Sequence, residues 1–223
     1  MAGDPYVYPG TEVLRNKLDL RDADELANAE ADLTKIRAAQ LADQPINGNY
    51  DLAHLRHVHG HLFGDLYDWA GELRTVTIAK SEMFALPQFV ESYASESLRR
   101  LASEDHLQGL DRDEFVTKAA GYLGDINAAH PFREGNGRTQ RAFFGQLAND
   151  AGYVIAWDRI DTDRNIEASI AAMRGVERPM RELLADVTTG LDRSTARERD
   201  QARQRDRARG PRNALDEDLG IDL

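Results

Sequence analysis

The sequence predicts an all-α domain that carries one small β-hairpin, and three observations support this fold class. Apolar residues recur at helical spacing through most of residues 1–190, and glycines and prolines separate these stretches. A single segment, residues 73–85, favours strand instead. It is too short to form a stable sheet of its own, so we expect a hairpin that projects from a helical body.

The helices predicted before the hairpin follow from leucine spacing. In residues 23–41, leucines and an isoleucine recur at roughly helical intervals among many alanines. After the break at QPING, a stripe of leucines and one valine predicts a second helix over residues 51–66. In the hairpin segment, leucine, valine and isoleucine alternate with threonines, a pattern typical of strands.

The helices predicted after the hairpin have clear boundary signals. Pro87 opens a helix that extends to about Leu101. Asp111 and Glu114 form a capping-box start for the next helix, which ends at His130 because a following proline disfavours helical backbone. Three further helices are predicted over residues 138–151, 162–174 and 179–190.

Composition limits the function classes. The chain has 223 residues, which suits one domain, residues 1–190, followed by a charged tail over residues 191–223 that is helical or disordered. A net charge of -11 argues against direct binding of nucleic acid. No cysteine, basic leader or long apolar run is present, so we expect no membrane anchor and a cytoplasmic location, with secretion as an effector as the alternative.

Residues 130–141, HPFREGNGRTQR, combine a base, a carboxylate, glycines and cations in one loop between two helices. Gly135 and Gly137 permit a tight turn, and the second helix is expected to begin at Gly137 or Arg138. A helix N-terminus offers unpaired N–H groups to an anion, and Arg138 and Arg141 add charge that suits phosphates.

The same loop contains residues suited to metal and proton chemistry. Glu134 is its only carboxylate and is therefore the natural ligand for Mg²⁺ arriving with a nucleotide. His130 has a reference pKa of about 6.5, which suits a general base near neutral pH. Together these parts predict transfer from a nucleotide phosphate.

The loop resembles the signature of the Fic family, His-Pro-Phe-x-(Asp/Glu)-Gly-Asn-Gly-Arg-x-x-Arg, at every fixed position. The stretches YVYPGTEVLRNK, LRHVHGHLFGDLYDWAGELRTVTIAK and AWDRID are also similar to bacterial Fic proteins, so the resemblance covers about residues 6–175. It implies a Fic-type helical core whose β-hairpin, the flap, covers the active-site loop. It also implies transfer of AMP from ATP to a hydroxyl of a target protein, with release of pyrophosphate.

The resemblance assigns roles by position. It implies that His130 is the general base and that Glu134 holds Mg²⁺. Gly135, Asn136 with its side-chain amide, and Gly137 would form an anion hole for the phosphates. Arg138 would hold the β- and γ-phosphates, and Arg141 would orient the γ-phosphate. Phe132 would anchor the loop in the core.

The flap, residues 75–84, would align the target backbone by strand addition. Lys80 and Ser81 would then lie near both the target and the nucleotide.

Two alternatives remain open. Doc kinases have a lysine where Gly137 stands, and a Doc-like protein kinase is the first alternative. The second is a catalytically inactive Fic scaffold that only binds partners. The resemblance favours AMP transfer, because the glycine is present and the loop is intact.

The resemblance also bears on control. Many Fic proteins carry an inhibitory helix with Ser/Thr-x-x-x-Glu-Gly/Asn, whose glutamate pairs with the second motif arginine. Here Ser92 to Glu96 and Ser194 to Glu198 match the spacing, but serine and arginine follow instead of Gly or Asn. We therefore expect that Arg141 is not paired within the chain. The chain is then predicted to be a toxin restrained by a separate small antitoxin.

The histidines at 54, 57, 59 and 61 lie close together on a predicted helix, a pattern that could indicate a metal site. No carboxylate or thiol obviously completes such a site, so packing or surface roles are favoured. Trp69 and Trp157 are interpreted as aromatic anchors.

Overall fold

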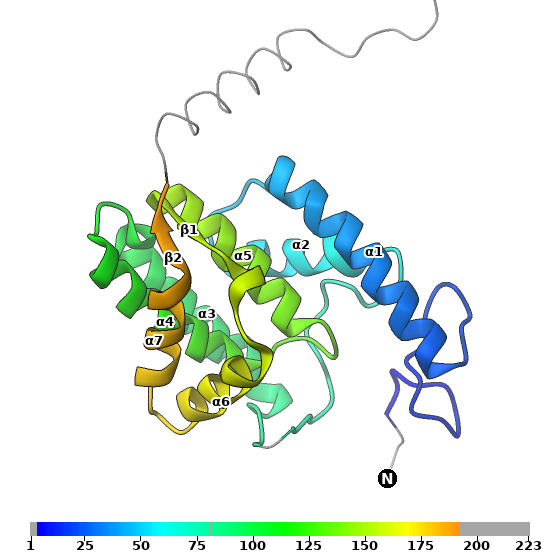
Figure 1. Cartoon of the computed structure of the whole chain (residues 1–223). Helices are drawn as coiled ribbons and strands as arrows, with labels where there is room; N and C mark the ends of the chain where they lie inside the picture. Colours follow the sequence, from blue (N-terminus) through cyan, green and yellow to red (C-terminus); the bar gives the residue numbers. More distant parts are fainter. Residues whose placement is uncertain (1–3, 81, 192–223) are drawn as a thin grey trace, which may run out of the picture. The chain divides into compact units, whose positions relative to one another are not determined.

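The computed structural model describes residues 4–80 and 82–191, and within them the protein is helical, as predicted (Figure 1). The helices are α1 (Ala23–Asp43), α2 (Leu52–Phe63), α3 (Pro87–Ser103), α4 (Arg112–Ala129), α5 (Asn136–Ala151), α6 (Thr162–Met173) and α7 (Arg178–Val187). Two short strands, β1 (Tyr153–Ile155) and β2 (Thr188–Gly190), pair antiparallel. The tail predicted over 191–223 lies, apart from Leu191, outside the described residues.

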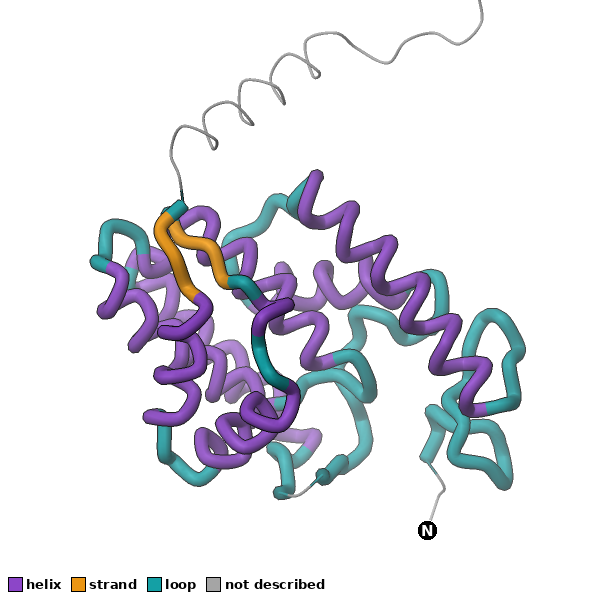
Figure 2. The backbone as a smooth tube through the Cα atoms, in the orientation of Figure 1, coloured by secondary structure: helices purple, strands orange, loops and turns teal. Residues whose placement is uncertain are grey.

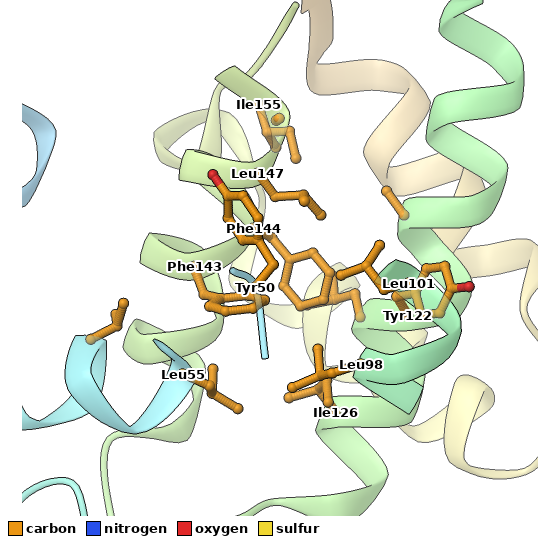
Figure 3. Close-up of a cluster of buried hydrophobic side chains, with 14 of the residues drawn as sticks. Tyr50, Leu55, Leu98, Leu101, Tyr122, Ile126, Phe143, Phe144, Leu147 and Ile155 are labelled. Atoms are coloured by element: carbon orange, nitrogen blue, oxygen red, sulfur yellow. The ribbon is translucent and has the colours of Figure 1, made fainter. Parts of the chain in front are cut away.

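Helix α4 is the centre of the packing. It contacts α3, α5, α6 and α7, while α1 and α2 pack against α5 on its other side. The core around it is rich in aromatic and leucine side chains from several helices (Figure 3). Because α4 and α5 are both anchored in this core, the loop that joins them is held at both ends.

Helix starts follow the local signals that the sequence contains. The carboxylate of Asp111 accepts a hydrogen bond from the Glu114 N–H at 2.9 Å, and Asp51 caps α2 in the same way. Pro87 occupies the first turn of α3, where its missing N–H costs nothing. These caps explain why the predicted starts of these helices lie within a residue or two of the observed ones.

The two-stranded sheet lies where none was predicted. Tyr153 pairs with Gly190 and Ile155 pairs with Thr188. The sheet therefore joins the segment that follows α5 to the segment that follows α7 (Figure 2). The helix predicted over 179–190 therefore ends early, at Val187. Strands of three residues are too short for alternation to be visible in the sequence.

The flap has less strand pairing than the predicted hairpin. Among the described residues of 73–85, an isolated bridge joins Ala79 and Met83, and the Phe84 N–H donates to the Ile78 carbonyl at 3.4 Å. The Lys80 N–H donates to the carbonyl of Glu82 at 3.1 Å, which closes the turn. The carbonyls of Val76 and Ala85 are bound by the Arg74 guanidinium, so they do not bond to a facing strand. Ser81 lies outside the described residues.

No helix in the described part of the chain has both the length and the apolar character needed to cross a bilayer.

Candidate active site

The loop between α4 and α5 is braced from within. Asn136 accepts a hydrogen bond from the Phe132 N–H at 2.9 Å and donates one to the Phe132 carbonyl at 2.7 Å. The Phe132 ring is buried and stacks on His59 with ring centroids 3.9 Å apart, which confirms it as the anchor of the loop. The brace uses one of the two N–H groups of the Asn136 amide, so the anion-hole role of this side chain stays a prediction.

Gly135 is required by packing as well as by backbone conformation. It precedes the first residue of α5 with a φ of 78°, a region that favours glycine. A Cβ at this position would lie 2.2 Å from the ring of Phe63. The turn therefore places the start of α5 directly against α2. Helix α5 begins at Asn136, one residue before Gly137 and two before Arg138, the two predicted starts.

The N-terminus of α5 is open to an anion. No side chain caps it, and the Thr139 N–H is the first to bond back to the carbonyl of Gly135. The N–H groups of residues 136–138 thus have no acceptor within the helix. Their partial positive charge, with the helix dipole, favours a phosphate here.

His130 is held in one orientation with one nitrogen available. It ends α4 in left-handed conformation, with a φ of 43°. Its ring stacks on Phe84 of the flap, with centroids 3.7 Å apart, and Nδ1 lies 3.3 Å from the carbonyl oxygen of Asn127. A carbonyl can only accept, so Nδ1 carries the proton and Nε2 is left as a base.

Burial, together with the positive charges of Lys80 and Arg74, lowers the pKa of His130 to about 3. The imidazole is therefore neutral at pH 7. A neutral ring with a free Nε2 can accept a proton from a hydroxyl.

A cavity of about 360 Å³ opens beside His130. The loop and α5 contribute His130, Gly137 and Arg141, and the flap contributes Lys80, Glu82 and Phe84. The remaining wall is formed by side chains that the sequence analysis did not single out for the site: Leu123, Asn127, Gln140, Asn165, Ile166, Ser169, Ile170, Met173 and Met180, together with Trp157. Most come from α6 and α7. In the sequence, the apolar residues among them recur at the same helical spacing as core residues, so the pattern does not distinguish a cavity wall from the core.

The structure separates the two motif arginines. Arg141 lines the cavity. Burial lowers the pKa of its guanidinium, and the neighbouring positive charge of Arg138 contributes to the same shift. No carboxylate within residues 4–80 and 82–191 forms an ion pair with Arg141. Arg138 instead points toward α1, where it pairs with Glu30.

Glu134 fits a magnesium ligand by its chemistry. Its side chain is 43% exposed, and one carboxylate oxygen accepts the Gly135 N–H at 2.8 Å. Mg²⁺ commonly takes one or two carboxylates and completes its shell with water and phosphate oxygens. Within the described part of the chain, no group of three or more histidine, aspartate or glutamate side chains is arranged to bind a metal.

The histidines of α2 take part in packing. Nδ1 of His59 accepts the Gly71 N–H at 2.8 Å, and Nε2 lies 3.0 Å from the carbonyl oxygen of Glu134. Nδ1 accepts and Nε2 donates, so the His59 ring joins the Glu134 carbonyl of the loop to Gly71. His54 is buried as well, against Tyr50 and Phe143.

Arg74 is a site residue that sequence reasoning missed. It is 2% exposed, and its guanidinium binds the carbonyls of Val76 and Ala85 in the flap and of Ala129 and His130 at the end of α4. Burial lowers its pKa. An arginine amid threonines and valine, in ELRTVT, gave no signal that it would be buried.

Known proteins share this arrangement. Residues 49–148 match the Fic/DOC family. The chain is 38% identical over 173 residues to the probable protein adenylyltransferase Fic of Escherichia coli, covering 77% of this chain and 86% of that protein. The chain belongs to the Fic/DOC family.

Two further Fic relatives are informative. Protein adenylyltransferase VbhT of Bartonella schoenbuchensis is 44% identical over 184 residues, which are 82% of this chain and 38% of VbhT. The chain thus matches less than half the length of that relative. The N-terminal Fic domain of a VirB-translocated Bep effector of Bartonella quintana, solved with bound ADP, superposes with a TM-score of 0.78 at 32% identity, covering 84% of this chain and 95% of that one.

Proposed function

We propose that the protein is a protein adenylyltransferase that transfers AMP from ATP to a hydroxyl side chain of a target protein. The observation that carries the proposal is the neutral His130, whose free Nε2 lies at a cavity beside the uncapped N-terminus of α5. Relatives over most of the chain are named protein adenylyltransferases, and one similar Fic domain was solved with ADP bound.

The reaction follows from the placement of these groups. The target hydroxyl attacks the α-phosphorus of ATP, its proton passes to Nε2 of His130, and the bond to pyrophosphate breaks. The N–H groups of residues 136–138 and the charge of Arg141 stabilise the phosphate oxygens. Arg138 adds charge from the side of α1, and its role toward the β- and γ-phosphates remains a proposal.

Magnesium, held by Glu134, would neutralise phosphate charge when bound. The wall from α6 and α7 suits a nucleobase, because Ile170 and Met173 offer apolar surface to its rings and Asn165 and Ser169 offer polar groups to its edge.

The flap is proposed to position the target. The described residues of 75–84 are closed by the Ala79–Met83 bridge and the bond from the Phe84 N–H to the Ile78 carbonyl, and we propose that a target segment adds alongside this narrow loop. Lys80 is exposed and lines the cavity, near where the target and the nucleotide would meet.

Labelled ATP tests the reaction. Purified protein is incubated with candidate targets and ATP labelled at either the α- or the γ-phosphate, with His130→Ala in parallel. Label from the α-phosphate alone, absent in the variant, supports AMP transfer. Label from the γ-phosphate alone would instead show a kinase of the Doc type, and no label with intact ATP binding would favour a scaffold.

We also propose that a separate antitoxin restrains the enzyme by pairing a glutamate with Arg141. Arg141 lacks a carboxylate partner among the described residues and faces the cavity, which supports this role. Expression of the chain alone in the bacterial cytoplasm should arrest growth, and His130→Ala should not. If the wild-type chain is harmless and the Glu198→Gly variant is active, the inhibitory glutamate lies in the tail instead.

A further inference from the structure

Glu30 of α1 lies between the first motif arginine and a buried tyrosine. One oxygen of its carboxylate pairs with Nη2 of Arg138, and the other accepts the hydroxyl of Tyr67. The Glu30 side chain is only 12% exposed. The carboxylate is therefore fixed at both oxygens and strongly shielded from water, so its attraction for Arg138 exceeds that of an exposed partner.

The rest of the Arg138 guanidinium is fixed by two other neighbours. Nη1 lies 3.3 Å from the hydroxyl oxygen of Thr34, one helical turn beyond Glu30. The guanidinium carbon lies 4.8 Å from the centre of the Phe63 ring, a cation–π distance. Helices α1 and α2 thus hold the arginine at a single position beside the start of α5.

A second carboxylate competes for the same nitrogen. Oε1 of Glu134 lies 3.6 Å from Nη2 of Arg138, one turn earlier in the chain. Glu134 is more exposed than Glu30, at 43% against 12% for the side chains, so the buried carboxylate has the stronger hold. Without Glu30, the guanidinium would have Glu134 as its nearest acidic partner, and a paired Glu134 is a poorer metal ligand.

We propose that Glu30 is a positioning residue: it takes the closer ion pair with Arg138, keeps the Arg138–Glu134 pair long at 3.6 Å, and so leaves the Glu134 carboxylate available to magnesium. The proposal rests on the proposed function for the metal and the nucleotide. Glu30 itself touches neither; it acts through Arg138.

Binding measurements test this directly. Calorimetry with ATP over a series of Mg²⁺ concentrations should show that Glu30→Gln needs about tenfold more Mg²⁺ for half-maximal binding, the change that about 1.4 kcal/mol produces. Tyr67→Phe, which frees the second Glu30 oxygen, should shift the requirement in the same direction but less. Both variants are expected to raise the KM for ATP more than they lower kcat.

Asp65→Asn is the matched control. Asp65 accepts two hydrogen bonds from Arg37 of α1, at 2.7 and 2.8 Å, and so also ties α1 to the chain after α2. It contacts no residue of the motif in these hydrogen bonds. Loss of this pair should leave the Mg²⁺ requirement unchanged, which separates an effect on Arg138 from a general loosening of α1.

The double variant decides the mechanism. In an Arg138→Gln background, Glu30→Gln should no longer change the Mg²⁺ requirement, because the competing cation is gone. The proposal would be overturned if Glu30→Gln shifted the Mg²⁺ requirement equally in both backgrounds. It would also be overturned if neither Glu30→Gln nor Tyr67→Phe shifted the requirement, or if either variant bound Mg²⁺ and ATP more tightly. Because these are binding measurements, they decide it even if the wild-type protein transfers no AMP, a result that would reject the proposed function alone.

Discussion

Nδ1 of His130 lies 3.3 Å from the carbonyl oxygen of Asn127, three residues earlier in α4. The contact fixes the tautomer, because a carbonyl can bond only to a protonated nitrogen. It also depends on the left-handed backbone of His130, which turns the ring back over the end of its own helix. The orientation of the base is thus built into the way α4 ends.

Replacement of His130 by alanine should lower the rate of transfer by about 10²–10⁴-fold, the usual contribution of a general base. Binding of ATP should persist, because the N–H groups of α5 and Arg141 are unchanged. Single-turnover kinetics with α-labelled ATP measures the first effect, and calorimetry measures the second. Transfer near the wild-type rate would mean that another group is the base.

The pH dependence of transfer should lack an acid limb from His130. Its pKa is lowered to about 3, mainly by burial, so the neutral base is fully populated above that value. From about pH 8 down to pH 5, kcat/KM should not fall through protonation of this ring. A limb with a midpoint near the usual histidine pKa, lost in His130→Ala, would contradict this assignment. NMR titration of the His130 ring gives an independent measurement.

Acid should destabilise the fold through His59. Burial lowers its pKa to about 4, whereas the unfolded chain has an ordinary histidine pKa. As the pH falls below the unfolded value, the unfolded state gains a proton that the folded state does not, so the free energy of unfolding drops. The slope approaches about 1.4 kcal/mol per pH unit until the folded pKa is reached. Urea unfolding should show a shallower acid slope for His59→Gln, and no change for the exposed His57→Gln.

Gly135→Ala should be far more damaging than Gly152→Ala. Both glycines have positive φ, 78° and 90°, so each alanine carries a similar backbone cost of about 1–2 kcal/mol. At Gly135 the added Cβ would also meet Phe63, whereas at Gly152 nothing lies within 4 Å. We expect a further loss of about 1–3 kcal/mol in unfolding free energy and a large loss of transfer. Equal effects in both variants would show that the Phe63 contact is unimportant.

The helices and the loop could be predicted because their signals are local. Asp111 and the His-Pro pair mark the ends of α4 in the sequence itself, and the Gly-Asn-Gly turn indicates the start of α5 within two residues. The Fic-family resemblance then supplied the chemistry of the loop. It did not reveal that the Asn136 amide also braces the loop, because these hydrogen bonds depend on how the loop folds back on Phe132.

The features that the sequence did not reveal depend on contacts between distant residues. The partner of Arg138 is Glu30, more than a hundred positions away, on a helix where acidic residues are frequent. Strands β1 and β2 exist because the segments after α5 and α7 meet in space. In the flap segment a buried arginine, Arg74, binds the carbonyls of Val76 and Ala85, and no periodicity encodes that.

Arg74 should control both the flap and the base. Its guanidinium bonds to the His130 carbonyl at 2.7 Å and to that of Val76 at 2.8 Å, so it joins the end of α4 to the flap. Lysine keeps the charge but lacks the planar fork, and buried carbonyls left without donors cost about 1–3 kcal/mol each. Arg74→Lys should therefore reduce transfer strongly, raise the KM for the target and shift the NMR signals of the His130 ring. The control is Arg112→Lys, because Arg112 also binds main-chain carbonyls, those of Thr188 at 3.0 Å and Ala185, but at the opposite end of α4 from the loop. If both variants lose stability and only Arg74→Lys alters the His130 ring, Arg74 positions the base; an unaltered ring would limit its role to stability.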